Sequence, residues 1–599
     1  MTSNENASLA TNGIAAGDAD GTRRLTKRRL SIPALLIALG LYAVVICPNA
    51  IWNRDQINPD AIAYIRHAVY LSEGRWLDSV SGYWSPLLSW SLAPLIYFGL
   101  DGLYASRVVL GVWGAVLVIG SSFFVSRCTE LDFPWNRLVP ILVALAAARW
   151  ATIVITPDVL LGALLVWYFA FTAKPEVLYR RRIQVLAGIF GGLAYFAKSY
   201  AFPFFLAHYP FSLLLHLVLR RTNTSVAQVF KALGYGFLAF SMVAGPWVYL
   251  LSYKYGKFTF STAAALNHYI VGPPEVVDRY HVLCRPQVPL SGRMAIGETP
   301  EHLDFKDWSP FASLALFKHQ VKHMIWNGER IVRTLSDFDF LALVPGCLFL
   351  MPLIRIAAAR RGTIELASPY PAAWSLMTIG IYAGGFLPIA FETRYIEPVL
   401  WPLCCTLVFG VISDVSQLCR PVLLDKSARS YPALVPVFLS ALCALSFVGY
   451  SKGTIYRGAG VIRTVLGSGS VPQSAFRQCG KELAASGCRG PVVASERCWH
   501  EGLYVSYHAS LPFLGEIREK SPREVEQSLQ KLGARAFVAH SMWPFYEDFV
   551  SNTKWQKLCT TELYGTHAIS VFIRPETEST SLNSAVPSTA AGNENRGNR

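Results

Sequence analysis

The sequence predicts a polytopic α-helical membrane protein with about eleven transmembrane helices, one non-spanning juxtamembrane helix and a C-terminal extracytoplasmic α/β domain. Hydrophobic residues make up 52% of the 599 residues and charged residues only 16%, whereas a soluble domain has about a quarter charged. The apolar residues form repeated blocks of about 20, the length that crosses about 30 Å of hydrocarbon. The net charge of +15 lies mainly in short clusters between these blocks. This placement is typical of cytoplasmic loops and not of a nucleic-acid-binding patch.

Four regions follow one another along the chain. Residues 1–30 are polar and then basic, and we expect a disordered cytoplasmic N-terminus. Residues 31–450 form the multi-span membrane domain. Residues 451–574 return to a soluble composition, and 575–599 form a second disordered tail.

Basic clusters set the direction in which each apolar block crosses the membrane. The block 85–100 is only 16 residues long. All clusters fall on the cytoplasmic side if this block lies along the outer leaflet without crossing. Two outer regions then result, a first outer loop at 52–103 and a large outer loop at 252–335. The predicted spans are 31–51, 104–126, 138–155, 158–174, 183–197, 200–219, 229–251, 338–355, 371–390, 395–413 and 432–450.

Residues 451–574 predict a small α/β domain outside the membrane. The expected elements are a strand at 492–494, a helix at 522–531, and strands at 536–539 and 568–573. The region contains an even number of cysteines, which allows three disulfide pairings in an oxidising compartment, with unpaired thiols as the alternative. These cysteines are Cys479, Cys488, Cys498 and Cys559.

Five ionisable residues lie at the outer ends of the predicted spans. Charged groups at the end of a span inside a helix bundle are costly, and they mark functional sites. The five come from distant parts of the chain but fall on one side, which favours a shared site over ordinary loop charges. They are Asp60, Asp158, Lys198, Glu392 and Arg394.

The first outer loop predicts a helix that carries Asp60. Asn58 is suited to cap this helix and Gly74 to end it. Asp60, Tyr64 and His67 share one face of it. The alternative for Asp60 is a favourable interaction with the helix dipole, and for His67 it is a plain surface position.

Several short motifs resemble the C-type (GT-C) membrane glycosyltransferase superfamily. This superfamily includes protein O-mannosyltransferases, lipid A aminoarabinose transferases and cell-wall arabinofuranosyltransferases. The motifs are Pro59-Asp60-Ala61-Ile62-Ala63-Tyr64-Ile65-Arg66, Gly82-Tyr83-Trp84-Ser85-Pro86-Leu87, Thr156-Pro157-Asp158 opening a span, Ala197-Lys198 closing one, and Glu392-Thr393-Arg394-Tyr395.

The resemblance implies a hexosyl- or pentosyltransferase of the cell envelope. Its donor would be a polyprenyl-phosphate sugar, and its acceptor an envelope glycan, lipid or protein at the outer face of a bacterial inner or plasma membrane. No cofactor is certain. Members often carry two adjacent acidic residues in the first loop, where this chain has Asp60-Ala61, so a divalent cation stays open.

The chemistry assigns expected roles to the charged residues. Phosphate leaves readily once its charge is stabilised, so one carboxylate can serve as general base for the acceptor hydroxyl. Asp60 is the candidate base, and Asp158 would share that role or orient the acceptor. Lys198 and Arg394 would bind the donor phosphate, with Glu392 orienting Arg394. For the two cations the alternatives are snorkelling and a local ion pair. Further residues expected to line the substrate are Tyr64, Arg66, His67, Tyr83 and Tyr395.

Other kinds of protein and site stay open at this point. A transporter or flippase would show paired repeats and ionisable residues near the bilayer midplane. A non-catalytic envelope-assembly subunit could keep the same fold. His319 and His323 are spaced to share a helix face as zinc ligands, but no third ligand is evident.

Overall fold

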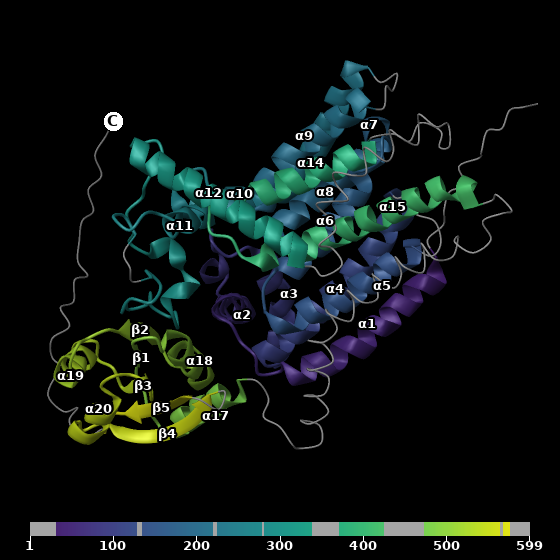
Figure 1. Ribbon diagram of the computed structural model, residues 1–599. Helices are drawn as coiled ribbons and strands as arrows, with labels where there is room; N and C mark the ends of the chain where they lie inside the picture. The colour runs from purple at the N-terminus through teal and green to yellow at the C-terminus, as the bar shows by residue number, and fades with distance from the viewer. Residues whose placement is uncertain are drawn as a thin grey trace, which may run out of the picture.

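The computed structural model describes residues 31–128, 135–219, 225–277, 281–337, 370–423, 473–563 and 567–575. Long helices run side by side and form one body, and a small α/β domain lies at one end of them, next to helix α2 (Figure 1). The long helices are α1 (Ile32–Trp52), α4 (Gly102–Cys128), α5 (Trp135–Ile153), α6 (Asp158–Thr172), α8 (Arg181–Ala197), α9 (Ala201–Leu219), α10 (Val226–Tyr255), α14 (Tyr370–Gly384) and α15 (Glu397–Leu423).

The helices follow the predicted spans closely where the structure describes them. Among the described residues, five helices are long and apolar enough to cross a membrane, namely α1, α4, α5, α9 and α10. Helix α6 is shorter and buried along nearly its whole length, as expected for an apolar helix at the centre of a bundle. The predicted spans 338–355 and 432–450 lie outside the described residues. The count of eleven spans therefore stays a prediction.

Two short helices lie in the region predicted as the first outer loop. Helix α2 (Pro59–Ser72) begins where the sequence predicts it and is followed by Gly74 with a φ of 76°, a left-handed conformation that favours glycine. Helix α3 (Pro86–Tyr97) has 12 residues. At 1.5 Å per residue it is about 18 Å long, too short to cross about 30 Å of hydrocarbon. This length agrees with the expectation that block 85–100 does not cross.

Helix α14 ends earlier than the predicted span 371–390. It stops at Gly384, and residues 385–391 continue without regular helix up to the 3₁₀ turn η5 (Thr393–Tyr395). The paired glycines at 384 and 385 and then Pro388 disfavour a longer helix. The irregular segment leads directly into Glu392 and Arg394.

Gly162 brings α6 and α15 together. A Cβ atom at this position would lie 2.6 Å from the carbonyl oxygen of Pro398, so only glycine permits the contact. Small residues allow such close approach between helices in membranes. Helix α6 begins with Asp158, and α15 begins three residues after Arg394. The contact therefore draws the two candidate site segments towards one another.

The region predicted as the large outer loop adds helices at the end of the body that holds α2. The 3₁₀ turn η2 (Ile296–Glu298) packs against α2, and the 3₁₀ turn η3 (Pro300–His302) packs against helix α11 (Ala263–Tyr269). Helix α12 (Leu314–Asp337) is a long amphipathic helix. In Figure 1 these elements lie at the end of the bundle that also holds α2.

The α/β domain holds a five-stranded sheet in the order β2-β1-β3-β5-β4. Strands β1, β2 and β3 are parallel, and β5 and β4 are antiparallel to their neighbours. The elements are α17 (Ser474–Ala485), β1 (Val492–Ser495), α18 (Trp499–Ala509), β2 (Phe513–Ile517), α19 (Pro522–Lys531), β3 (Ala536–His540), α20 (Tyr546–Asn552), β4 (Gln556–Leu563) and β5 (His567–Ile573).

The sequence prediction for this domain found four of these elements and missed the others. The predicted strands and the helix 522–531 are present as β1, α19, β3 and β5. Strand β2 was missed because Gly515 and Glu516 interrupt its apolar pattern. Strand β4 lies at the edge of the sheet and is largely polar, as edge strands often are.

Sidedness can be tested by cysteine labelling with a membrane-impermeant maleimide. We expect a cysteine in place of Leu77 or Met542 to be labelled from outside, because both positions are exposed and on the predicted outer side. Ser81 of the same loop is 2% exposed and unsuited to the test. A cysteine in place of Arg181 should react only after the membrane is permeabilised. External labelling at position 181 would contradict the topology.

Candidate functional site

Asp60 is held at the start of α2 by a hydrogen bond of Asn58, two residues before it. Asn58 occupies the N-cap position, but its side chain makes no capping bond. Instead its Oδ1 accepts a hydrogen bond from the backbone N–H of Ile155 at 3.0 Å. This bond ties the start of α2 to the turn between α5 and α6, a few residues before Asp158 at the start of α6. The Asp60 side chain keeps 30% exposure, so it is within reach of a substrate.

Asp158 and Lys198 form a largely buried ion pair. The Lys198 Nζ lies 2.6 Å from Oδ1 of Asp158, and their side chains are 20% and 4% exposed. Thr156 donates a hydrogen bond to the other carboxylate oxygen at 2.9 Å. Burial lowers the pKa of Lys198, and the Asp158 carboxylate opposes this shift. The pair joins the start of α6 to the end of α8.

Arg394 forms the second cationic centre. Its Nη2 lies 2.8 Å from Oδ2 of Asp60, and its Nε and Nη2 donate to the two oxygens of Glu392 at 2.7 and 3.0 Å. Burial disfavours the charged form, but Asp60, Asp158 and Glu392 outweigh it and raise the Arg394 pKa. Arg394 therefore stays cationic.

Tyr395 connects the two pairs. The Lys198 Nζ lies 3.5 Å from the centre of its ring, and the Arg394 Cζ lies 5.4 Å from it. The ring face is attractive to cations, and it shields both from water. All five outer-face residues predicted from the sequence are thus linked around one aromatic ring.

Tyr64 and Tyr83 lie at the edge of this cluster. Tyr64 is buried, and its ring meets that of Trp84 edge to face at a centroid distance of 5.1 Å. Burial and the charges of Asp60 and Asp158 raise the pKa of its hydroxyl. Burial and Asp60 likewise raise the pKa of Tyr83. Both tyrosines therefore stay neutral hydrogen-bonding groups beside the carboxylate.

Arg66 and His67 belong to a different cluster, centred on Glu298. The Arg66 Nε lies 3.7 Å from a Glu298 oxygen, and the His67 Nε2 lies 3.0 Å from the Glu298 carbonyl oxygen. Burial lowers the pKa of His67 to about 4, so it is a neutral, structural side chain near pH 7. The sequence offered no signal for Glu298, a buried carboxylate that also accepts from Tyr70 and from the Met294 N–H.

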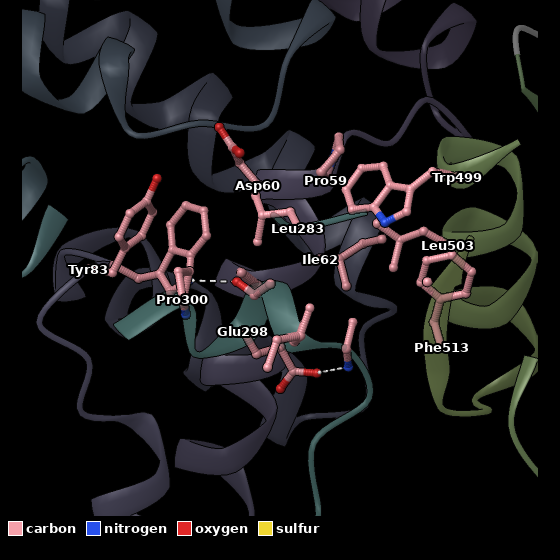
Figure 2. Close-up of a pocket in the computed structure, with 16 residues that line it drawn as sticks. Pro59, Asp60, Ile62, Tyr83, Leu283, Glu298, Pro300, Trp499, Leu503 and Phe513 are labelled. Atoms are coloured by element: carbon pink, nitrogen blue, oxygen red, sulfur yellow. Dashed lines mark hydrogen bonds between the residues drawn. The ribbon is translucent and has the colours of Figure 1, made fainter. Parts of the chain in front are cut away.

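A cavity of about 60 Å³ lies between the start of α2, the segment around Glu298 and the α/β domain. Figure 2 shows Trp499, Leu503 and Phe513 of the α/β domain on one side and Tyr83 on the other. Asp60 lies at the edge, with its carboxylate pointing away from Trp499 and Phe513. Trp499 and Phe513 were not predicted, because a single aromatic residue in a soluble domain has no distinguishing pattern.

The described residues do not fit a metal centre. No group of three or more His, Cys, Asp or Glu among them is placed to hold a metal ion. Asp60 and Asp158 are each already neutralised by a cation. His319 and His323 lie on α12, and the Nε2 atom of each contacts a backbone carbonyl oxygen. The His319 Nε2 lies 2.8 Å from the carbonyl oxygen of Val271, and the His323 Nε2 lies 3.4 Å from that of Ile389.

Two of the four C-terminal cysteines are brought together. Cys479 on α17 is buried, and its thiol is hydrogen-bonded to that of Cys559 on β4. Cys498 is buried and Cys488 is partly buried. No disulfide is formed among the described cysteines, so the predicted pairing stays open.

No family model matches the sequence, and no curated protein matches it. Solved structures are similar over most of the chain. ArnT from Cupriavidus metallidurans, bound to undecaprenyl phosphate, is 14% identical over 90% of this chain and 98% of its own, with a TM-score of 0.48.

Two further solved structures are similar at lower identity. The oligosaccharyltransferase AglB from Archaeoglobus fulgidus, in complex with an inhibitory peptide and a dolichol-phosphate, is 13% identical over 91% of this chain and 75% of its own, with a TM-score of 0.46. The arabinofuranosyltransferase AftD from Mycobacteria is 11% identical over 91% of this chain and 40% of its own, with a TM-score of 0.46.

Proposed function

We propose that this protein is a membrane glycosyltransferase that transfers a hexosyl or pentosyl group from a polyprenyl-phosphate sugar to a cell-envelope acceptor at the outer face of the membrane. One observation carries the proposal. Two carboxylate–cation pairs, Asp60–Arg394 and Asp158–Lys198, come from separate parts of the chain and meet around the Tyr395 ring.

The two cations suit a phosphate that enters from a bilayer. Each cation is held by carboxylates in this structure, so neither is left as a buried unpaired charge, which would be costly. A donor phosphate replaces Asp60 as the partner of Arg394 and joins Asp158 as a second partner of Lys198, whose ammonium group has three donors. Charge-assisted bonds from both cations then stabilise the phosphate as the sugar leaves it.

Donor binding also prepares Asp60 for catalysis. Once Arg394 turns to the phosphate, the Asp60 carboxylate is free to accept the proton of the acceptor hydroxyl. The acceptor oxygen forms a bond to the anomeric carbon, and the bond from that carbon to the phosphate oxygen breaks. The products are the glycosylated acceptor with inverted configuration and the polyprenyl phosphate. The proton stays on Asp60 until water removes it.

The cavity beside Asp60 is the place for the acceptor. Its walls carry the aromatic rings of Tyr83, Trp84 and Trp499, which offer flat apolar faces with polar edges. The Asp60 carboxylate points away from Trp499 and Phe513, so the reacting hydroxyl of the acceptor meets Asp60 at the edge of the cavity and not inside it.

A transfer assay tests the function. Purified full-length protein in lipid nanodiscs is incubated with radiolabelled polyprenyl-phosphate hexoses and pentoses and with extracted envelope glycans, lipids and proteins. We expect label to move from one donor into one acceptor class. Absence of both transfer and donor binding across the panel would contradict the proposal.

Arg394 should matter mainly for donor binding. We expect Arg394→Ala to weaken donor binding roughly 10- to 150-fold, because a hydrogen bond to a charged group worth about 1.5–3 kcal/mol is lost. Arg394→Lys should recover only part of it, since the planar guanidinium is missing. The measurement is equilibrium binding of a radiolabelled polyprenyl phosphate.

Arg489→Ala is the matched control, because Arg489 is an exposed arginine of the α/β domain. Its donor affinity should equal that of the wild type. Equal affinity for Arg394→Ala and wild type would remove Arg394 from the donor site.

A further inference from the structure

Helix α12 of the large outer loop is fixed to the protein by two amide side chains, which are buried on the same face as the apolar Ile331 and Leu335. Asn327 is fully buried and donates to the carbonyl oxygens of Phe386 at 3.2 Å, Leu387 at 3.0 Å and Ile389 at 2.8 Å. Gln320 is buried and donates to the Pro388 carbonyl oxygen at 3.1 Å.

The opposite face of α12 is apolar and exposed. Leu314 and Ile325 are each 68% exposed. The spacing of three, four and seven residues places the exposed apolar side chains in one stripe along the helix. We call this the outer stripe of α12, and its members are Leu314, Phe317, Val321, Ile325 and Val332.

Basic residues border the outer stripe. Lys318, Lys322 and Arg333 are exposed beside it. An apolar stripe with lysines along its side is the composition of a helix that lies in a membrane interface, where the basic groups meet lipid phosphates. The residues that follow α12, at 338–355, are a predicted span. The sequence therefore predicts that the chain enters the bilayer directly after α12.

We propose that α12 lies in the outer-leaflet interface, with its outer stripe among the lipid acyl chains and Lys318 and Lys322 at anionic headgroups. A lipid surface fits better than a protein partner, because apolar and basic stripes side by side match acyl chains and phosphates. The buried face of α12 holds the carbonyl groups of 386–389, a few residues before Arg394. Through this contact, the membrane sets the distance of the proposed donor site from the bilayer. The position of α12 does not depend on which residues act in catalysis.

Photo-crosslinking tests the location of α12 without any activity measurement. A benzophenone amino acid is introduced at Val321 in the outer stripe, or at Arg333 as the matched exposed position on the charged side. The full-length protein is placed in nanodiscs that contain phosphatidylglycerol with labelled acyl chains. We expect several-fold more lipid crosslinking at 321 than at 333. Equal yields, or crosslinks to a second copy of the chain, would overturn the proposal.

A substitution in the stripe gives a second readout. Ile325→Glu changes an exposed side chain and leaves the buried bonds of Asn327 in place. We expect it to lower lipid crosslinking from position 321 several-fold, because a carboxylate is excluded from the acyl region. Glu329→Gln, on the charged side of the helix, should leave the yield unchanged. An unchanged yield for Ile325→Glu would overturn the interfacial position.

Discussion

Asp60→Asn should reduce turnover by roughly 10²–10⁴ while expression and folding stay intact, because general base catalysis typically contributes that factor. Asparagine keeps the size and hydrogen-bonding shape of the side chain but cannot accept the proton. The fold should tolerate the change, since Arg394 keeps its two hydrogen bonds to Glu392. The measurement is the initial rate of sugar transfer at saturating donor and acceptor.

Glu73→Gln is the control for this prediction. Glu73 lies directly after the last residue of α2, and its contact with Arg75 is a surface ion pair, which contributes little to stability. This variant should transfer sugar at the wild-type rate. Wild-type turnover in Asp60→Asn would show that another group takes the acceptor proton.

Lys198→Met should cause the largest loss of stability among the site variants. It leaves the Asp158 carboxylate, which is 4% exposed, without its cation. Removing one partner of a buried pair typically costs about 3–5 kcal/mol. We expect a clear fall in the thermal unfolding midpoint of the purified protein, and loss of donor binding.

The double variant Lys198→Met with Asp158→Asn separates the two effects. Neutralising both partners removes the buried unpaired charge, so most of the lost stability should return. Donor binding should not return, because the phosphate still lacks one of its cations. A single Lys198→Met variant as stable as the wild type would show that the pair is not buried as described.

The helical part of the fold is readable from the sequence because the bilayer imposes a simple rule. Long apolar blocks predicted α1, α4, α9 and α10 to within a few residues. Helix α14 ended early where Gly384, Gly385 and Pro388 interrupt the helix. The α/β domain was harder, since Gly515 inside β2 and the polar edge strand β4 weaken the alternating pattern on which strand prediction depends.

The candidate site was predicted in part for a similar reason. Asp60, Asp158, Lys198 and Arg394 stand out because charged residues at span ends are rare. Their pairing could not be read from the sequence, because it depends on the approach of α6 to α15 at Gly162.

The contacts of His67 and of Trp499 could not be predicted from the sequence. His67 was placed in the site by its helix face, but the structure turns it towards Glu298. Trp499 lines the cavity because the α/β domain packs against α2. No local sequence pattern predicts this packing.

A structure of the full-length protein with a polyprenyl phosphate, determined by electron cryo-microscopy in nanodiscs, tests the central claim most directly. The phosphate should lie within hydrogen-bond distance of both the Lys198 Nζ and the Arg394 guanidinium, with Asp60 released from Arg394. A phosphate bound elsewhere on the bundle, with the Asp60–Arg394 and Asp158–Lys198 pairs intact, would contradict the account.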